Sequence, residues 1–170
     1  MPTCGMFRHG QRESGGRNGW QSCYRTSARY APLISKNLST ADNPGPLGVP
    51  HGVTSCIMCP AVMKYNLKHG HDNPDISRRQ EKVKEILWSE QDVARQLQDA
   101  GLQKDFSDLG DALDVLIRAL GMPRTLSDMN ISSDVIPALS ERTLADHWSP
   151  TNPIPLLKAV QVQEILEMVV

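Results

Sequence analysis

The pattern of apolar and polar residues changes near residue 45 and divides the chain into two parts. Residues 1–44 show no helical or strand periodicity over a useful length, so we expect a poorly ordered segment there. From residue 51 onward, apolar residues recur at helical spacing, with short breaks between the runs. We therefore expect two regions: an unrelated, basic, Gly- and Arg-rich segment over 1–44 and an all-α body of about six helices over 45–170.

The first helix of this body is expected over residues 51–66, because the stretch is apolar nearly all round. Its apolar residues are Val53, Cys56, Ile57, Met58, Cys59, Ala61, Val62, Met63 and Tyr65. A helix without a polar face is a buried one. Pro60 should bend it, since proline removes a backbone donor and crowds the preceding turn. Gly70 and Pro74 then predict a loop over residues 68–74.

Amphipathic stripes with clear end signals predict the next three helices. The first covers residues 76–88, and Ser89 is the expected N-cap of a second helix that ends at Gly101. Ser107 is the expected N-cap of a third, which ends at Gly121. The stripe of this third helix has core-facing spacing and comprises Leu109, Ala112, Leu113, Leu116, Ile117 and Leu120.

Two helices are expected in the last part of the chain. Pro137 suits the first helical position, ahead of Leu139 and Leu144. Residues 150–155 should be extended, because each residue before a proline avoids the α region. The final helix is predicted from an apolar set that comprises Val160, Val162, Ile165, Leu166 and Val169. No period of 20–50 residues indicates a repeat architecture.

Composition and charge exclude several classes of protein. The 170 residues are 39% hydrophobic and 22% charged, with a formal net charge of −1, which is ordinary for a globular domain. A near-neutral balance argues against nucleic acid as a partner. No run of 18 apolar residues predicts a membrane-spanning helix. The charge is uneven, because residues 1–50 carry 6 Lys or Arg against 2 Asp or Glu.

The expected cellular location follows from cysteine content and from the first residues. Four cysteines are too few for a disulfide scaffold and favour a reducing compartment, so a cytoplasmic location is predicted. A mitochondrial location is the alternative, because five arginines with one acidic residue before Asp42 are typical of a transit peptide. The five glycines before residue 20 would weaken the amphipathic helix that import needs.

Three groups of residues could carry chemistry. Cys56 and Cys59 form a C-x-x-C pair, which fits buried small side chains better than a thiol or zinc module. His69 and His71 fall in a polar stretch and are expected to be solvated rather than ligating. His51 starts the predicted buried helix, where the helix dipole disfavours a charged ring, and a neutral imidazole is the form that binds metal.

The segment around His51 resembles a known enzyme family. Residues 45–66 contain a P-H-G element, an inner proline and a closing Y-N, and resemble the iron-type (group III) alcohol dehydrogenases. Further matches follow in order: L-G-M-P-R-T-L at 120–126, I-P-A-L-S at 136–140 and T-N-P-I-P at 151–155. The resemblance covers roughly residues 45–170. The pattern is most similar to the fungal-type branch of alcohol dehydrogenase and maleylacetate reductase.

The resemblance implies a function and a set of cofactors. Members of this family have an α/β domain that binds NAD(P) and an all-α C-terminal domain that holds a divalent metal, iron or sometimes zinc. The metal polarises an alcohol or carbonyl substrate, such as a maleylacetate-like acid, and the nicotinamide exchanges a hydride with it. His51 matches one of four metal ligands, which are one Asp and three His. Trp148 matches a position that faces the nicotinamide, and a homodimer is a further expectation.

The rest of the ligand set and the nucleotide-binding domain have no match in the sequence. The family's upstream histidines should lie in or before residues 37–44, which contain none. We therefore expect a truncated chain that is inactive by itself. Two other interpretations stay open: a non-catalytic helical interaction module that uses an uncovered apolar face of the His51 helix, and a thiol or zinc module at Cys56 and Cys59.

Overall fold

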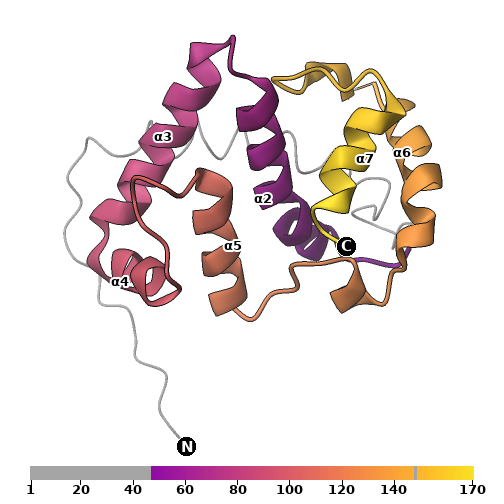
Figure 1. Ribbon diagram of the computed structural model, residues 1–170. Helices are drawn as coiled ribbons and strands as arrows, with labels where there is room; N and C mark the ends of the chain where they lie inside the picture. The colour runs from indigo at the N-terminus through magenta and orange to yellow at the C-terminus, as the bar shows by residue number, and fades with distance from the viewer. Residues whose placement is uncertain (1–46, 148) are drawn as a thin grey trace, which may run out of the picture.

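The computed structural model describes residues 47–147 and 149–170 and is helical throughout, with no strand in these ranges (Figure 1). The helices are α2 (His51–His69), α3 (Pro74–Ser89), α4 (Gln91–Asp99), α5 (Leu109–Ala119), α6 (Ile136–Leu144) and α7 (Ala159–Glu167). Three short 3-10 turns join them: η1 (Ser127–Met129), η2 (Ser133–Val135) and η3 (Ser149–Thr151). The prediction of an all-α body with about six helices is confirmed. The expected disorder of residues 1–44 lies outside the described residues.

Helix α2 lies in the middle of the described part, between two groups of helices (Figure 1). On one side it meets α6 and α7 in a core whose members include Ile57, Val62, Leu139, Ile165 and Leu166. On the other side Met63 of α2 packs with Leu87, Leu97, Leu109 and Ala112 from α3, α4 and α5. The all-round apolar sequence of α2 is therefore used on both sides, as a helix buried between two layers requires.

Helices α2 and α5 approach each other closely at Gly110. A Cβ atom added there would lie 2.7 Å from the backbone oxygen of Pro60 and 2.6 Å from Cγ of Lys64. Lys64 also pairs with Asp111 at the beginning of α5. Burial works to lower the pKa of Lys64, but the bond to Asp111 and the charge of Asp108 outweigh it and raise that pKa.

Helix ends agree with the sequence prediction at glycines and differ at N-caps. Gly101 and Gly121 end α4 and α5 with φ of 83° and 71°, as predicted. Ser107 is not the cap of α5. The N-cap is the next residue, Asp108, which forms a capping box with Asp111. Ser89 is not the cap of α4 either, since its hydroxyl donates to the carbonyl of Ile86 and Glu90 precedes the helix instead.

Some other expected boundaries and faces were wrong. The loop expected over residues 68–74 is shorter, because α2 continues to His69 and α3 begins at Pro74. Residues 150–155 are not all extended, since Ser149–Thr151 form the 3-10 turn η3. Leu120 was expected in the core but is 78% exposed, and Val160, one of the apolar residues that predicted the last helix, is 62% exposed. Leu120 is the residue after the last one of α5, and Val160 lies in the first turn of α7.

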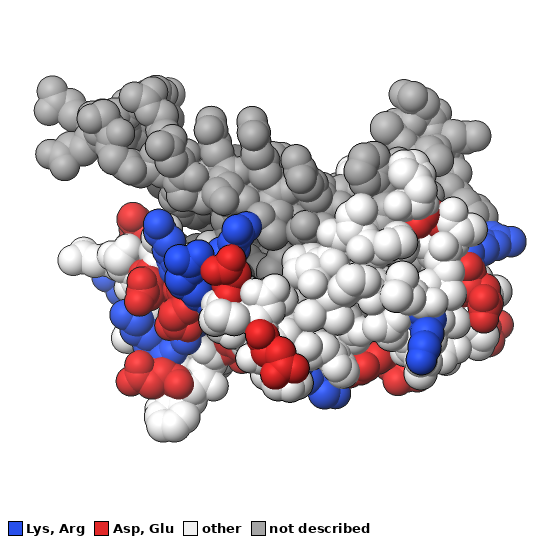
Figure 2. Space-filling view, turned by 90° about the horizontal axis from the view of Figure 1, so that it is seen from above, with Lys and Arg blue, Asp and Glu red and all other residues white. Residues whose placement is uncertain are grey.

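The large exposed apolar side chains of the described residues belong to segments other than α2. Besides Leu120 and Val160, they are Phe106, Leu157, Met168 and Val170. Figure 2 shows that charged side chains gather on the left, over the α3 side, and again at the right edge, whereas the middle of this face is mostly uncharged. None of the described helices is both long and apolar enough to cross a membrane.

Candidate functional site

His51 is the first residue of α2 and is exposed. Pro50 before it is extended, with φ −60° and ψ 143°, and its carbonyl accepts bonds from the backbone N–H of Thr54 at 3.0 Å and the hydroxyl of Thr54 at 3.1 Å. Val49 is buried in the core shared with α6 and α7. The Pro-His-Gly sequence therefore places an imidazole on the surface at the start of a helix whose next turns are buried.

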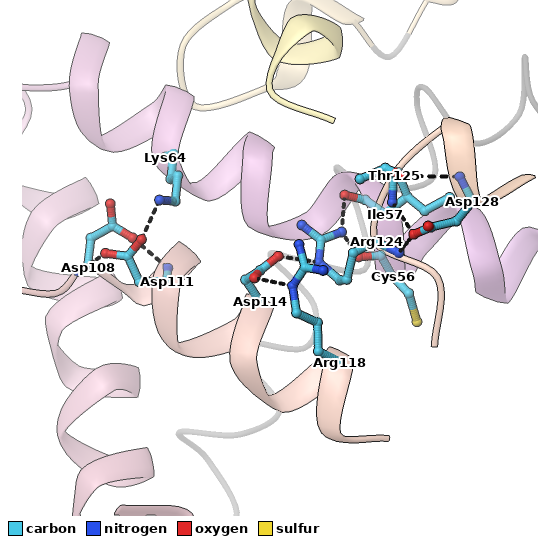
Figure 3. Close-up of polar contacts among 10 residues, drawn as sticks. All are labelled: Cys56, Ile57, Lys64, Asp108, Asp111, Asp114, Arg118, Arg124, Thr125 and Asp128. Carbon is cyan, nitrogen blue, oxygen red and sulfur yellow. Dashed lines mark hydrogen bonds and ion pairs between the residues drawn. The ribbon is translucent and has the colours of Figure 1, made fainter. Parts of the chain in front are cut away.

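An arginine from the loop after α5 contacts the backbone of this helix. The Nη1 atom of Arg124 donates to the carbonyl oxygens of Cys56 and Ile57, both at 2.7 Å (Figure 3). In a regular helix, the carbonyl of Cys56 would accept from the residue four positions later, which is Pro60 and has no N–H. Arg124 thus supplies the donor that Pro60 lacks.

The guanidinium of Arg124 is itself held by a carboxylate. Only 5% of its side chain is exposed, and its Nε donates to Asp114 on α5 at 2.6 Å. The other oxygen of Asp114 accepts from Arg118 at 2.7 Å. Burial works to raise the pKa of Asp114, but the hydrogen bonds from Arg118 and Arg124 outweigh it and lower that pKa. The carboxylate therefore stays ionised and keeps the Arg124 charge paired.

The backbone of the loop is fixed in the same place. The carboxylate of Asp128 accepts from the backbone N–H groups of Arg124 at 2.8 Å and Thr125 at 3.0 Å (Figure 3). In return, the hydroxyl of Thr125 accepts from the N–H of Asp128 at 3.0 Å. These two N–H bonds to the carboxylate lower the pKa of Asp128. The P-R-T-L motif, residues 123–126, thus forms a hydrogen-bonded turn, and the side chain of Arg124 extends from this turn to α2.

Two other sequence motifs meet at the opposite half of α2. The amides of Asn66 and Asn152 are both buried, and Asn152 Nδ2 donates to Asn66 Oδ1 at 2.7 Å. Asn66 Nδ2 donates back to Asn152 Oδ1 at 3.3 Å, and Asn152 also donates to the carbonyl of Ile154. The closing Y-N of the first motif and the T-N-P-I-P loop are therefore joined by a reciprocal amide pair.

Of the predicted site residues, Trp148 lies outside the described residues. The residues that follow it, Ser149–Asn152, are anchored near Asn66 through the amide pair. Asn66 is fifteen positions after His51 on the same helix, which corresponds to about 22 Å. Both assignments, His51 as a metal ligand and Trp148 as a cofactor contact, stay predictions.

Potential metal ligands do not gather around His51 in the described part of the chain. Among residues 47–147 and 149–170, no group of three or more His, Cys, Asp or Glu side chains could hold a metal ion. His71 is exposed in a turn, as expected. His69 was expected in a loop but ends α2, where its Nε2 lies 2.8 Å and 2.9 Å from the oxygens of Glu164. A metal at His51 would need ligands from elsewhere.

The two cysteines of the C-x-x-C pair are only half-buried, which corrects the expectation of fully buried side chains. Cys59 packs against the core around Met63, whereas Cys56 contributes its backbone oxygen to Arg124.

The sequence analysis missed Arg124, although a signal was present. A proline inside a long apolar helix leaves one carbonyl without its helical donor, and a buried carbonyl needs a partner. The sequence does not say which donor fills that place, because the arginine is 68 residues away from Cys56.

Comparisons with known proteins agree with the motifs. The family model for the Fe-containing alcohol dehydrogenase family, C-terminal, matches residues 40–170. The chain is 39% identical over 114 residues to Dehydrogenase ALT3 of Alternaria alternata, covering 67% of this chain and 29% of that protein. It is 36% identical over 124 residues to Dehydrogenase FUM7 of Gibberella moniliformis (strain M3125 / FGSC 7600), covering 73% and 28%. No solved structure matches significantly. The chain thus spans less than a third of the length of these relatives.

Proposed function

Because the chain belongs to the Fe-containing alcohol dehydrogenase family, we propose that its helical body is the C-terminal part of an NAD(P)-dependent dehydrogenase. Such an enzyme interconverts an alcohol and the corresponding carbonyl compound, and a maleylacetate-like acid is one candidate substrate. The observation that carries this proposal is the family match over residues 40–170, which includes the P-H-G element. Two curated fungal relatives are named dehydrogenases, which supports the reaction class.

We assign His51 the role of a metal ligand within this enzyme. A divalent metal such as iron or zinc supplies Lewis-acid polarisation of the substrate oxygen when it is bound. His51 suits this role because it is exposed at a helix start and the following turns are anchored by Arg124. The described residues offer this one candidate without a surrounding ligand cluster. We therefore expect no NADH turnover with simple aldehydes from the 170-residue chain alone.

A chimera provides the direct test of this assignment. Residues 45–170 replace the matched C-terminal part of the Alternaria alternata dehydrogenase, and the purified protein is assayed for bound metal and NAD(P)-linked alcohol oxidation. His51→Ala should remove both the metal and the turnover. His71→Ala is the matched control, because His71 is an exposed histidine in a turn, and it should change neither. Metal content and turnover that survive His51→Ala would refute the assignment.

A helical interaction module is the second candidate, and exposed apolar side chains favour it. Leu157 is 65% exposed and Val160 is 62% exposed at the start of α7, whereas the apolar residues of α2 are largely covered. The exposed apolar side chains therefore lie at and just before the start of α7 and not, as expected, on the His51 helix. A chain that stays monomeric at high concentration and captures no partner, measured by light scattering and co-purification, would count against this function.

A further inference from the structure

Helix α2 is divided by Pro60 into two parts that are supported differently. The second part, residues 60–69, packs between the two groups of helices and is tied to Asn152, Asp111 and Glu164. The first part, residues 51–59, carries His51, places Ile57 and Met58 in the core, and lies before the backbone bond that proline cannot make. The direction of this first part relative to the second therefore depends on this packing and on what replaces that bond.

We infer that Arg124 is a positioning residue for His51: its guanidinium completes α2 at Pro60 and so fixes the direction of the helical segment that carries the imidazole. The geometry supports this directly, because Nη1 lies 2.7 Å from the carbonyl oxygens of Cys56 and Ile57. The functional half of the inference rests on the proposed role of His51. The structural half stands on the contacts alone.

The side chain and the backbone of Arg124 are both held by residues outside α2. Asp114 holds Nε at 2.6 Å, and Asp128 holds the backbone N–H of Arg124 at 2.8 Å. Three donor bonds from one planar guanidinium are a pattern that arginine can make and lysine cannot. Arg124 therefore connects α5 and the η1 turn to the first part of α2 through fixed geometry rather than through charge alone.

A small change in direction would matter at His51. The imidazole is six residues before Ile57, about 9 Å along the helix. A swing of about 10° around that point would move His51 by about 1.5 Å, whereas a ligand set must be held within about 0.5 Å. Loss of the Arg124 bonds would thus misplace the ligand even while the rest of the domain stays folded.

The test measures the direction of the first part of α2 on the full 170-residue chain. Ser55→His creates a histidine pair with His51 at positions i and i+4, and Arg78→His with Lys82→His creates a second pair on the exposed face of α3. Each pair binds one added Cu²⁺ ion. The distance between the two ions, measured by pulsed EPR, reports the direction of the first part of α2 relative to α3. Replacing His51 by Ala removes the first ion and gives the background.

The expected result separates positioning from general stability. Arg124→Met should shift or broaden the distance between the two Cu²⁺ ions by about 1.5 Å, the displacement worked out above, while both pairs still bind Cu²⁺. Arg124→Lys should do the same, because lysine keeps the charge but not the planar fork, and it replaces the methionine variant if that variant folds poorly. An unchanged distance distribution, or a change that occurs only together with loss of Cu²⁺ from both pairs, would overturn the inference.

This experiment is independent of the proposed function. It uses added Cu²⁺ and engineered pairs, so it needs neither the native metal nor any turnover. If the chimera shows that His51 is no ligand, the Cu²⁺ distance still decides whether Arg124 sets the direction of the helix start. If the Cu²⁺ distance does not change, the chimera still decides the role of His51.

Discussion

The contact between Arg124 and the carbonyl left by Pro60 makes a sharp energetic prediction. Arg124→Met removes a donor from the carbonyls of Cys56 and Ile57, and only the Cys56 carbonyl then has no helical donor, which costs about 1–3 kcal/mol. It also removes one partner of Asp114, which keeps Arg118 and is 28% exposed, so this part costs less. The total loss of unfolding free energy should be about 1–4 kcal/mol, which is the carbonyl cost plus up to about 1 kcal/mol for the lost ion pair.

A double-mutant cycle then tests the cause. Pro60→Ala supplies a backbone N–H that can donate to the carbonyl of Cys56, so that carbonyl no longer depends on Arg124. The Arg124→Met change should therefore cost about 1–2 kcal/mol less in the Pro60→Ala protein than in the native one. This is the low end of the cost of an unpaired carbonyl, because the bond from Arg124 to the Cys56 carbonyl is only partly buried. Urea unfolding followed by circular dichroism gives the four free energies.

The control cycle pairs the same arginine change with Pro137→Ala. Pro137 is exposed near the start of α6, where no preceding helical carbonyl needs its N–H, so these two changes should be additive. The reasoning is refuted if Arg124→Met lowers the unfolding free energy equally, within about 0.5 kcal/mol, in the native protein and in Pro60→Ala. The two residues would then not act on the same carbonyl.

Three further predictions concern packing, a buried amide pair and pH. Gly110→Ala should lower the unfolding free energy by about 1–3 kcal/mol through overpacking against α2, whereas Gly52→Ala, with open space at its Cβ, should be neutral or slightly stabilising in urea unfolding. Asn152→Ala should cost about 1–3 kcal/mol, and adding Asn66→Ala should cost less than the sum of the single changes, since the first change already leaves an amide unpaired. Because the pKa of Asp114 is lowered in the folded state, its contribution is present above its unfolded pKa of about 3.9 and is lost as pH falls through the folded pKa. The unfolding free energy, measured by urea unfolding at several pH values from about 6 to about 2, should therefore fall more with decreasing pH for the native protein than for Asp114→Asn. An equal fall in the two proteins would contradict this.

The helices could be predicted because their signals are local. The stripe that begins at Leu109, and the stops at Gly101 and Gly121, depend on residues within a few positions of one another. The errors lie at the ends of elements, where one turn decides the outcome. Asp108 caps α5 in place of Ser107 because a second carboxylate at Asp111 completes a reciprocal pair. Val160 is exposed because an apolar residue in a first turn need not face the core.

By itself, the sequence determined that the body is helical, that the middle of α2 is buried, and that His51 starts this helix within a family motif. These conclusions follow from periodicity, end signals and short motifs, which act over one or two turns. The tertiary structure alone decided that Arg124 reaches α2 across 68 residues and that Asn152 meets Asn66 across 86. Such contacts depend on how whole helices pack, because a polar side chain in a core takes whichever partner the packing brings within about 3 Å.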